Sequence, residues 1–240
     1  MYKYEPSLGK VSYSCELSSP YGTHENTKVT CFAIHATKPY VLSAFSRGDI
    51  FLWHYGNSWE QKKRFYMGGG AEHIMFHPNN TIAFAATSGD ELEIFDLNYR
   101  QSVGPLKWRS PYSVICMDYF SHGDEQYLIT CAARRGDKTA EIWDFKSKTF
   151  FLTLEGHTSD VDTVCAHPSL PLLITGSSDG TVRIWDSTTF RLVSTLNFGL
   201  GKVLAVRCVR DSRRIAICCE DGLVVTEIDG EEPFASIGRQ

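Results

Sequence analysis

LEGHTSDVDTVCAHPSLPLLITGSSDGTVRIWD, residues Leu154–Asp186, carries the clearest folding pattern in the chain. Short apolar runs follow one another within it and just beyond it, at Val161–Ala166, Leu172–Gly176, Val182–Trp185 and Leu192–Leu196. A Pro turn at Pro168 and a Ser-Asp-Gly turn ending at Gly180 separate the first three runs. Short runs joined by tight turns predict four antiparallel strands in one sheet.

The stretch opens with Gly156-His157 and closes with Trp185-Asp186, which is the repeat signature of a β-propeller blade. Comparable anchors recur along the chain at Trp53-His54, Phe95-Asp96, Trp143-Asp144, Trp185-Asp186 and Ile228-Asp229. Successive anchors are 42, 48, 42 and 43 residues apart, close to the roughly 40–45 residues of this repeat. The sequence therefore predicts an all-β WD40 β-propeller of about five four-stranded blades.

We expect residues 1–240 to form a single propeller domain, with blades at about 29–66, 71–108, 113–155, 160–198 and 202–238. The segment Lys10–Leu17 is a lone strand candidate ahead of the first blade. As the outer strand of the last blade it would close the ring and remove two sheet edges. Pro233–Gly238 competes for the same place, and the sequence leaves open whether five blades close or stay open for a partner chain.

Four polar side chains of the opening stretch complement one another as hydrogen-bond donors and acceptors: His157, Thr175, Asp179 and Trp185. A buried indole N–H needs a partner, and we expect a chain running from tryptophan through threonine and histidine to aspartate. We interpret this tetrad as structural. The same residue types can form a nucleophile triad, but here they occupy positions that a propeller uses for stability.

Composition narrows the classes of function. The net charge of −4 gives no global basic field for nucleic acid, and no apolar run approaches the roughly 18 residues that span a bilayer. The N-terminus lacks the apolar core of a secretory signal, so we expect a cytoplasmic protein whose eight cysteines are reduced. No motif indicates a metal or a cofactor, and we predict that the chain is not an enzyme.

Beyond the repeat, the sequence resembles the end of the first propeller of the coatomer beta-prime family. The residues that carry the resemblance lie at 117–130, 139–158, 167–200, 211–222 and 229–237. Within them, RLVSTLNFGL at 191–200 and Glu-Glu-Pro at 231–233 are not generic to WD repeats. Residues 35–65 are similar to an earlier blade of that propeller, and residues 71–108 resemble the next one loosely.

The resemblance implies a non-catalytic protein-interaction module of the COPI vesicle coat, peripheral at Golgi and vesicle membranes through its partners. Coat subunits and the dilysine tails of membrane cargo are the implied partners, with acidic side chains taking the lysines. The alternative is a repurposed WD40 scaffold that has lost tail binding, because arginines stand in turns where the family has acids. The candidate partner-binding residues are Arg47, Arg134, Arg135, Asp137, Asp179 and Glu220.

Overall fold

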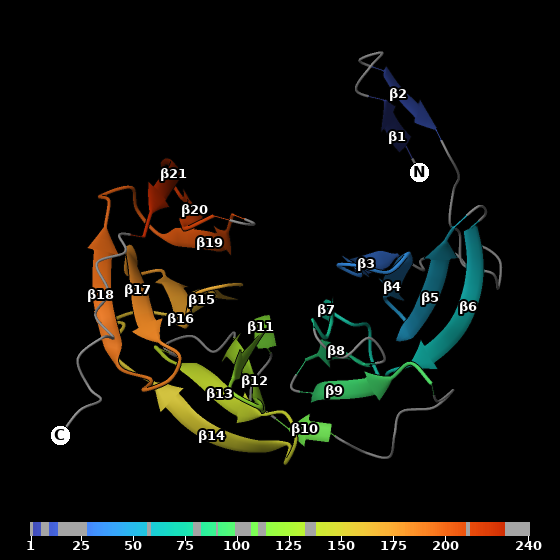
Figure 1. Cartoon of the computed structure of the whole chain (residues 1–240), viewed down its shortest axis with the longest axis horizontal. Helices are drawn as coiled ribbons and strands as arrows, with labels where there is room; N and C mark the ends of the chain where they lie inside the picture. Colours follow the sequence, from blue (N-terminus) through green and yellow to red (C-terminus); the bar gives the residue numbers. More distant parts are fainter. Residues whose placement is uncertain are drawn as a thin grey trace. The chain divides into compact units, whose positions relative to one another are not determined.

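A computed structural model of the chain describes residues 2–5, 10–13, 28–56, 59–78, 83–89, 91–98, 107–109, 114–132, 138–209 and 212–228. In these ranges the regular structure is antiparallel β-sheet, and they contain no helix. The chain divides into two compact units, Met1–Lys107 and Trp108–Gln240. Each unit is described by itself below, with the strand labels of Figure 1.

The first unit contains a hairpin followed by two larger sheets. The hairpin pairs β1 (Tyr2–Glu5) with β2 (Lys10–Tyr13). The next sheet has the order β3 (Val29–Ile34), β4 (Tyr40–Phe45), β5 (Asp49–Tyr55) and β6 (Trp59–Tyr66). The third has the order β7 (His73–Phe76), β8 (Ala83–Ser88), β9 (Glu91–Asp96) and β10 (Lys107–Arg109), and the division between the two units falls within β10.

Aromatic packing joins the two larger sheets of the first unit. The ring of Phe65, on β6, meets Phe84 edge to face at 5.0 Å between ring centroids, and Phe84 stacks on Phe95 at 4.8 Å. All three side chains are fully buried. Leu42 and Ile50, from the same sheet as Phe65, are buried in the same core. Such aromatic contacts stabilise a core beyond the area they bury, so two sheets with short strands share one core.

The second unit contains three sheets in chain order. The first has the order β11 (Val114–His122), β12 (Glu125–Ala132), β13 (Ala140–Asp144) and β14 (Thr149–Leu154). The second has the order β15 (Val161–Ala166), β16 (Leu172–Ser177), β17 (Thr181–Asp186) and β18 (Leu192–Asn197). The third contains β19 (Val203–Cys208), β20 (Arg214–Cys219) and β21 (Gly222–Glu227).

Neighbouring sheets of the second unit pack through their first strands, with β15 in contact with both β11 and β19. Figure 1 shows the fourth strands β14 and β18 on the outer side of this unit. Buried residues pack between the sheets. Ile129, Ile142 and Leu173 belong to the core shared by the first and second sheets, and Ile174 and Val206 belong to the core shared by the second and third. A single sheet of this size exposes both faces, so stacking on its neighbours supplies most of its buried area.

At three of the anchors, the aspartate that follows the anchor residue shapes the turn from the third strand to the fourth. The Oδ1 atom of Asp186 accepts the backbone N–H groups of Thr188 and Thr189 at 2.6 and 3.0 Å. Asp144 and Asp96 accept backbone N–H groups from Ser147 and Asn98 in the same way. Aspartate favours turns because its side chain can hydrogen-bond the backbone a few residues on, which explains its place in the repeat.

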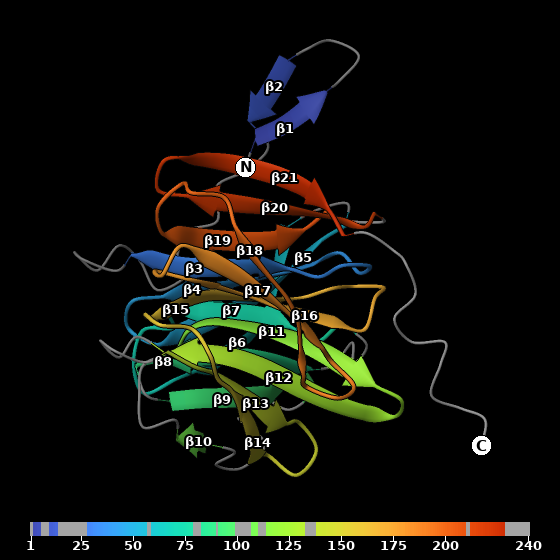
Figure 2. The ribbon, with the colours of Figure 1, turned by 90° about the vertical axis from the view of Figure 1, so that its left-hand side faces the viewer.

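The fold class predicted from the sequence is confirmed, because five antiparallel sheets of three or four strands follow one another along the chain. The last sheet has three described strands, and Figure 2 shows β21 at its edge. β2 pairs with β1 in the structure, so its use as a closing strand has no support among the described residues. Pro233–Gly238 lies outside them, and single-domain organisation and ring closure stay predictions.

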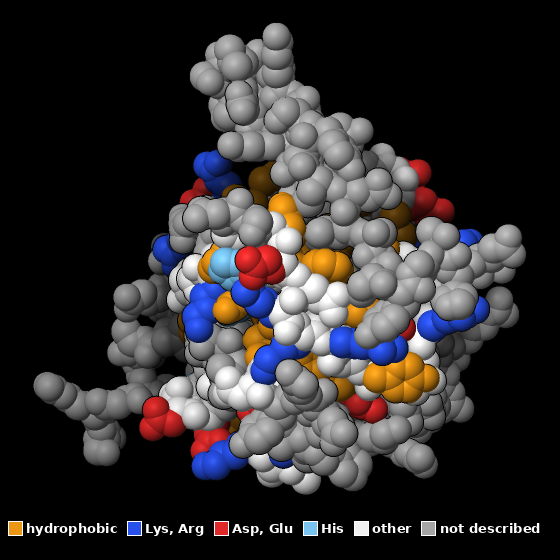
Figure 3. Space-filling view, turned by 90° about the vertical axis from the view of Figure 1, so that its right-hand side faces the viewer, with side chains coloured by type: hydrophobic (Ala, Val, Ile, Leu, Met, Phe, Trp, Pro, Cys, Tyr) orange, Lys and Arg blue, Asp and Glu red, His pale blue; other side chains and the backbone are white. Residues whose placement is uncertain are grey.

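The outer strand β6 of the first unit carries a basic run. Lys62 and Arg64 are exposed, and they form ion pairs with Glu60 and Asp49. Figure 3, which faces the side on which β6 lies in Figure 1, shows several Lys and Arg side chains on that face. Charged side chains on an edge strand discourage pairing with another chain, so this run has a sufficient structural explanation.

Candidate functional site

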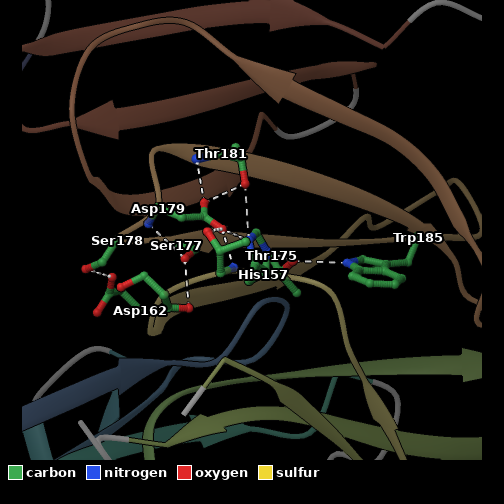
Figure 4. A network of polar contacts seen from close by, with 10 residues as sticks. His157, Asp162, Thr175, Ser177, Ser178, Asp179, Thr181 and Trp185 are labelled. Carbon is green, nitrogen blue, oxygen red and sulfur yellow. Dashed lines mark hydrogen bonds and ion pairs between the residues drawn. The ribbon is translucent and has the colours of Figure 1, made fainter. Parts of the chain in front are cut away.

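The structure brings the four tetrad residues together in one continuous chain of hydrogen bonds (Figure 4). The indole Nε1–H of Trp185 donates to Thr175 Oγ1 at 3.0 Å. Thr175 Oγ1 lies 2.8 Å from His157 Nε2, and His157 Nδ1 lies 3.0 Å from Asp179 Oδ2. The chain spans the segment before β15, the strands β16 and β17, and the turn between them.

The direction of these hydrogen bonds identifies the tautomer of His157. Asp179 can only accept, so His157 Nδ1 carries a proton and donates it. In a neutral ring Nε2 then accepts the Thr175 hydroxyl proton, which the bond from Trp185 leaves free. Burial lowers the pKa of His157, and this outweighs the raising effect of Asp179. A neutral imidazole therefore satisfies every partner in the chain.

Asp179 accepts more hydrogen bonds than the tetrad requires. Its Oδ1 accepts the backbone N–H and the hydroxyl of Thr181 at 2.8 and 2.6 Å, and its Oδ2 accepts the backbone N–H of Thr158 at 2.8 Å in addition to His157. Burial alone would raise the pKa of Asp179, but these hydrogen bonds outweigh it and lower the pKa below its ordinary value. Its side chain is only 7% exposed.

Four acceptor sites are about what one carboxylate offers, and internal donors occupy them. These internal donors leave Asp179 no lone pair for a partner's lysine, and a structural role for this residue stays our prediction. Sequence reasoning missed Thr158 and Thr181 as members of this network. Their signal was present, because hydroxyl residues beside a turn aspartate commonly hydrogen-bond across the turn.

Among the described residues, two other sheets keep the tryptophan end of the chain. Trp53 Nε1 donates to Ser43 Oγ at 2.8 Å, and Trp143 Nε1 donates to Thr130 Oγ1 at 3.1 Å. In the sheet of β7–β10, the anchor is Phe95, and the strand register places Ala86 where Thr175 stands. Donor and acceptor are lost together there. Losing both groups costs less stability than losing one, since neither a buried donor nor a buried acceptor is left unpaired.

The remaining partner-binding candidates belong to different units or lie outside the described residues. Arg47 is exposed in the turn between β4 and β5 of the first unit, and Glu220 is exposed in the turn between β20 and β21 of the second. Arg134, Arg135 and Asp137 lie outside the described residues. The role of this set in partner binding therefore stays a prediction.

A second acidic side chain accompanies Glu220. Its neighbour Asp221 is also exposed, and both carboxylates lie against Gly201: a Cβ built there would come 3.2 Å from Glu220 Oε2 and 3.3 Å from Asp221 Oδ2. The backbone holds the turn, because Glu220 N–H donates to Lys202 O at 2.9 Å. Two exposed carboxylates on a short fixed turn can receive a cationic group. We call this pair, Glu220 and Asp221, the acidic turn.

No three His, Cys, Asp or Glu side chains of the described ranges come together as metal ligands. Nor do those ranges include a helix of the length and apolarity needed to cross a bilayer.

Comparisons with known proteins agree with this geometry. The WD domain, G-beta repeat family matches residues 148–186, the part of the chain that holds the tetrad. The chain is similar to coatomer subunit beta' of Rattus norvegicus (36% identity) and to coatomer subunit beta'-1 of Arabidopsis thaliana (40% identity). Each match covers 68% of this chain but only 18% of the relative, so the matched part is less than a fifth of those proteins. The chain is a WD-repeat protein and a partial relative of coatomer subunit beta'.

Proposed function

We propose that the chain is a non-catalytic protein-interaction module that acts with a COPI-type vesicle coat in the cytoplasm, at Golgi and vesicle membranes. Its partners would be coat subunits or the basic tails of membrane cargo, and membrane association would come through them. The similarity to coatomer beta' subunits supports this role. The observation that carries the cargo-tail part is the acidic turn, where Glu220 and Asp221 are both exposed.

A lysine ammonium attracts each exposed carboxylate by roughly 0.2–1 kcal/mol. Such contacts suit weak and reversible recognition of a peptide tail. The Lys202 side chain is also exposed beside the turn. It limits the affinity, because it competes with an incoming cation for the two carboxylates. We therefore expect micromolar affinity that falls as salt concentration rises.

A repurposed scaffold is the second candidate. Asp179, which could have served as a further acid, is occupied by internal donors. Arg47 is an exposed arginine in an equivalent second-to-third strand turn, and it repels a basic tail. In this case the chain binds another protein and not a dilysine tail.

A peptide titration separates the two candidates. A fluorescent C-terminal dilysine peptide and its serine-substituted version are titrated into the purified chain. We expect binding of the dilysine peptide only. The double variant Glu220→Gln/Asp221→Asn should weaken it roughly two- to tenfold. Asp124→Asn, an exposed acid in the turn between β11 and β12, is the matched control and should leave it unchanged. Equal or undetectable binding of the two peptides would favour the repurposed scaffold.

A further inference from the structure

Two cysteines from neighbouring sheets of the second unit meet at the strands that join those sheets. Cys165 lies on β15 and Cys208 on β19, and their Sγ atoms are 3.4 Å apart. Both are free thiols in this structure. They lie 43 positions apart in the sequence, and both pack in the core shared by the two sheets. Sulfurs this close need to approach by only about 1.4 Å to reach the bond length of a disulfide, about 2.05 Å.

The two thiols differ in access and in charge environment. Cys165 is 4% exposed, whereas Cys208 is only half-buried. The Cys165 thiol donates its hydrogen bond to Cys208 Sγ. This contact lowers the pKa of Cys208, with a further lowering effect from Arg207, while the same contact, burial and the charge of Asp118 raise the pKa of Cys165. Cys208 is the accessible nucleophile, and Cys165 is the protonated thiol beside it.

We propose that Cys208 and Cys165 form a peroxide-responsive modification site that links β19 covalently to β15. In the first step, the Cys208 thiolate attacks one oxygen of a hydroperoxide, the O–O bond breaks, and the leaving oxygen takes a proton to give an alcohol or water. Cys208 becomes a sulfenic acid. In the second step, Cys165 sulfur attacks Cys208 sulfur, the S–O bond breaks, and water leaves with the thiol proton. Two thiols are oxidised and one peroxide is reduced.

The bond would fasten the last sheet to the one before it. The last sheet has three described strands, and exposed Leu223 and Val225 lie on its edge strand β21. A disulfide that closes a loop of this length restricts the unfolded chain. Oxidation should therefore raise the melting temperature of the full chain by on the order of 5–10 °C. A thiol reductant should reverse the shift.

Peptide mapping tests the site directly. The full chain is treated with hydrogen peroxide, remaining thiols are blocked, and the protein is digested with trypsin without reduction. Trypsin cuts after Lys148, Arg183, Arg207 and Arg210. The expected product is therefore peptide 149–183 joined to peptide 208–210, with loss of two free thiols per chain. Dithiothreitol should release the two peptides.

Three variants distinguish the chemistry from a structural effect. In Cys165→Ser, Cys208 should be trapped by dimedone as the sulfenic acid, because its resolving thiol is gone. In Cys208→Ser, the dimedone adduct, the cross-link and the shift in melting temperature should all disappear. Cys218→Ser is the matched control, since Cys218 is an exposed thiol on β20 of the same sheet. It should form the cross-link at the wild-type rate.

Several outcomes would overturn the proposal. Cys116 and Cys131 are opposite each other in the β11–β12 register and form a competing pair. A cross-link between those two cysteines in place of Cys165 and Cys208 would contradict it. So would oxidation of Cys208 to the sulfinic acid in the wild-type chain without any cross-link, or no reaction of either thiol with the peroxide. None of these outcomes bears on peptide binding by the acidic turn.

Discussion

Trp185 and Thr175 face each other across β16 and β17, and the 3.0 Å hydrogen bond between them is the buried end of a chain that ends at Asp179. This relationship connects the core of the sheet to a turn at its edge. Trp185 packs among the buried residues shared with the preceding sheet. The tetrad is therefore a link between packing and turn geometry, and the predictions below address each part of it.

Loss of the indole should destabilise the second unit strongly. Trp185→Ala leaves a cavity and removes the donor to Thr175, and we expect a loss of roughly 3–5 kcal/mol in the free energy of unfolding. Urea denaturation followed by circular dichroism measures this loss. Val193→Ala on β18 of the same sheet is the control, because Val193 is exposed and the change should fall within about 0.5 kcal/mol. A loss for Trp185→Ala no larger than that of the control would contradict the structural role.

Acid should destabilise the tetrad through His157. The pKa of His157 is lowered in the folded chain, so the unfolded chain binds the proton more readily and stability rises with pH in this range. The stabilising contribution is complete above the ordinary pKa of 6.5 and is lost as pH falls below it. Denaturation at pH 7.5 and pH 5.5 should show this loss. His157→Gln should reduce the difference between the two pH values, although His35 and His167 retain part of it because their pKa values are also lowered by burial.

Asp179 acts in the same direction at lower pH. Its pKa is lowered in the folded chain, so its contribution is present above its ordinary value of 3.8 and is lost as pH falls through the lowered value.

A pH dependence that is identical in the wild type and in His157→Gln between pH 7.5 and pH 5.5 would contradict the assignment of the neutral imidazole.

Gly156, which precedes the tetrad histidine, should not tolerate a side chain. Its φ of +139° is rare for other residues, and a Cβ would come 2.1 Å from Arg183 Nη1. We expect Gly156→Ala to cost on the order of 1–3 kcal/mol, measured by denaturation. Gly199→Ala is the control, because Gly199 also has a positive φ, of +67°, but nothing lies within 4 Å of a Cβ there. Equal losses at the two positions would contradict the greater backbone cost expected at Gly156, since a φ near +67° is one that other residues adopt more readily than +139°.

Removal of the N-terminal segment tests ring closure. If the segment completes the last blade, deletion of Met1–Leu17 exposes the edge of β21 and should cause aggregation, measured by light scattering. Substitution of Pro for Val11, within β2, is a milder test, because proline removes a strand hydrogen bond without shortening the chain. A deleted chain that stays monomeric with an unchanged melting temperature would contradict closure by this segment.

Much of the fold could be predicted from short-range patterns. The strands of the first blade lie where alternating apolar residues and turn signals placed them, from Val29 to Tyr66. The tetrad was recognised because Gly156-His157 and Trp185-Asp186 belong to one repeat, in which the separation in sequence implies the separation in space. The pairing of β2 with β1 was not predicted, since a lone apolar run does not specify its partner.

The candidate site divides in the same way. Sequence pattern identified Asp179 as an acid in a turn and predicted its hydrogen bond with His157. Only the structure shows that Thr158 and Thr181 also occupy its oxygens. Sequence pattern also identified Glu220 but not the closeness of Asp221 to the same glycine. Hydroxyl and carboxylate side chains have several rotamers each, and packing around the turn selects the ones that meet.

The sequence by itself determined the repeat, the strands and the turns of this protein, because each depends on residues within one blade. Only the tertiary structure decided what meets between sheets, such as the 3.4 Å approach of Cys165 and Cys208. That approach depends on how β15 packs against β19, which is set by buried side chains such as Ile174, Val206 and Ile217. Contacts between sheets arise from the combined shape of many side chains, and no local pattern encodes them.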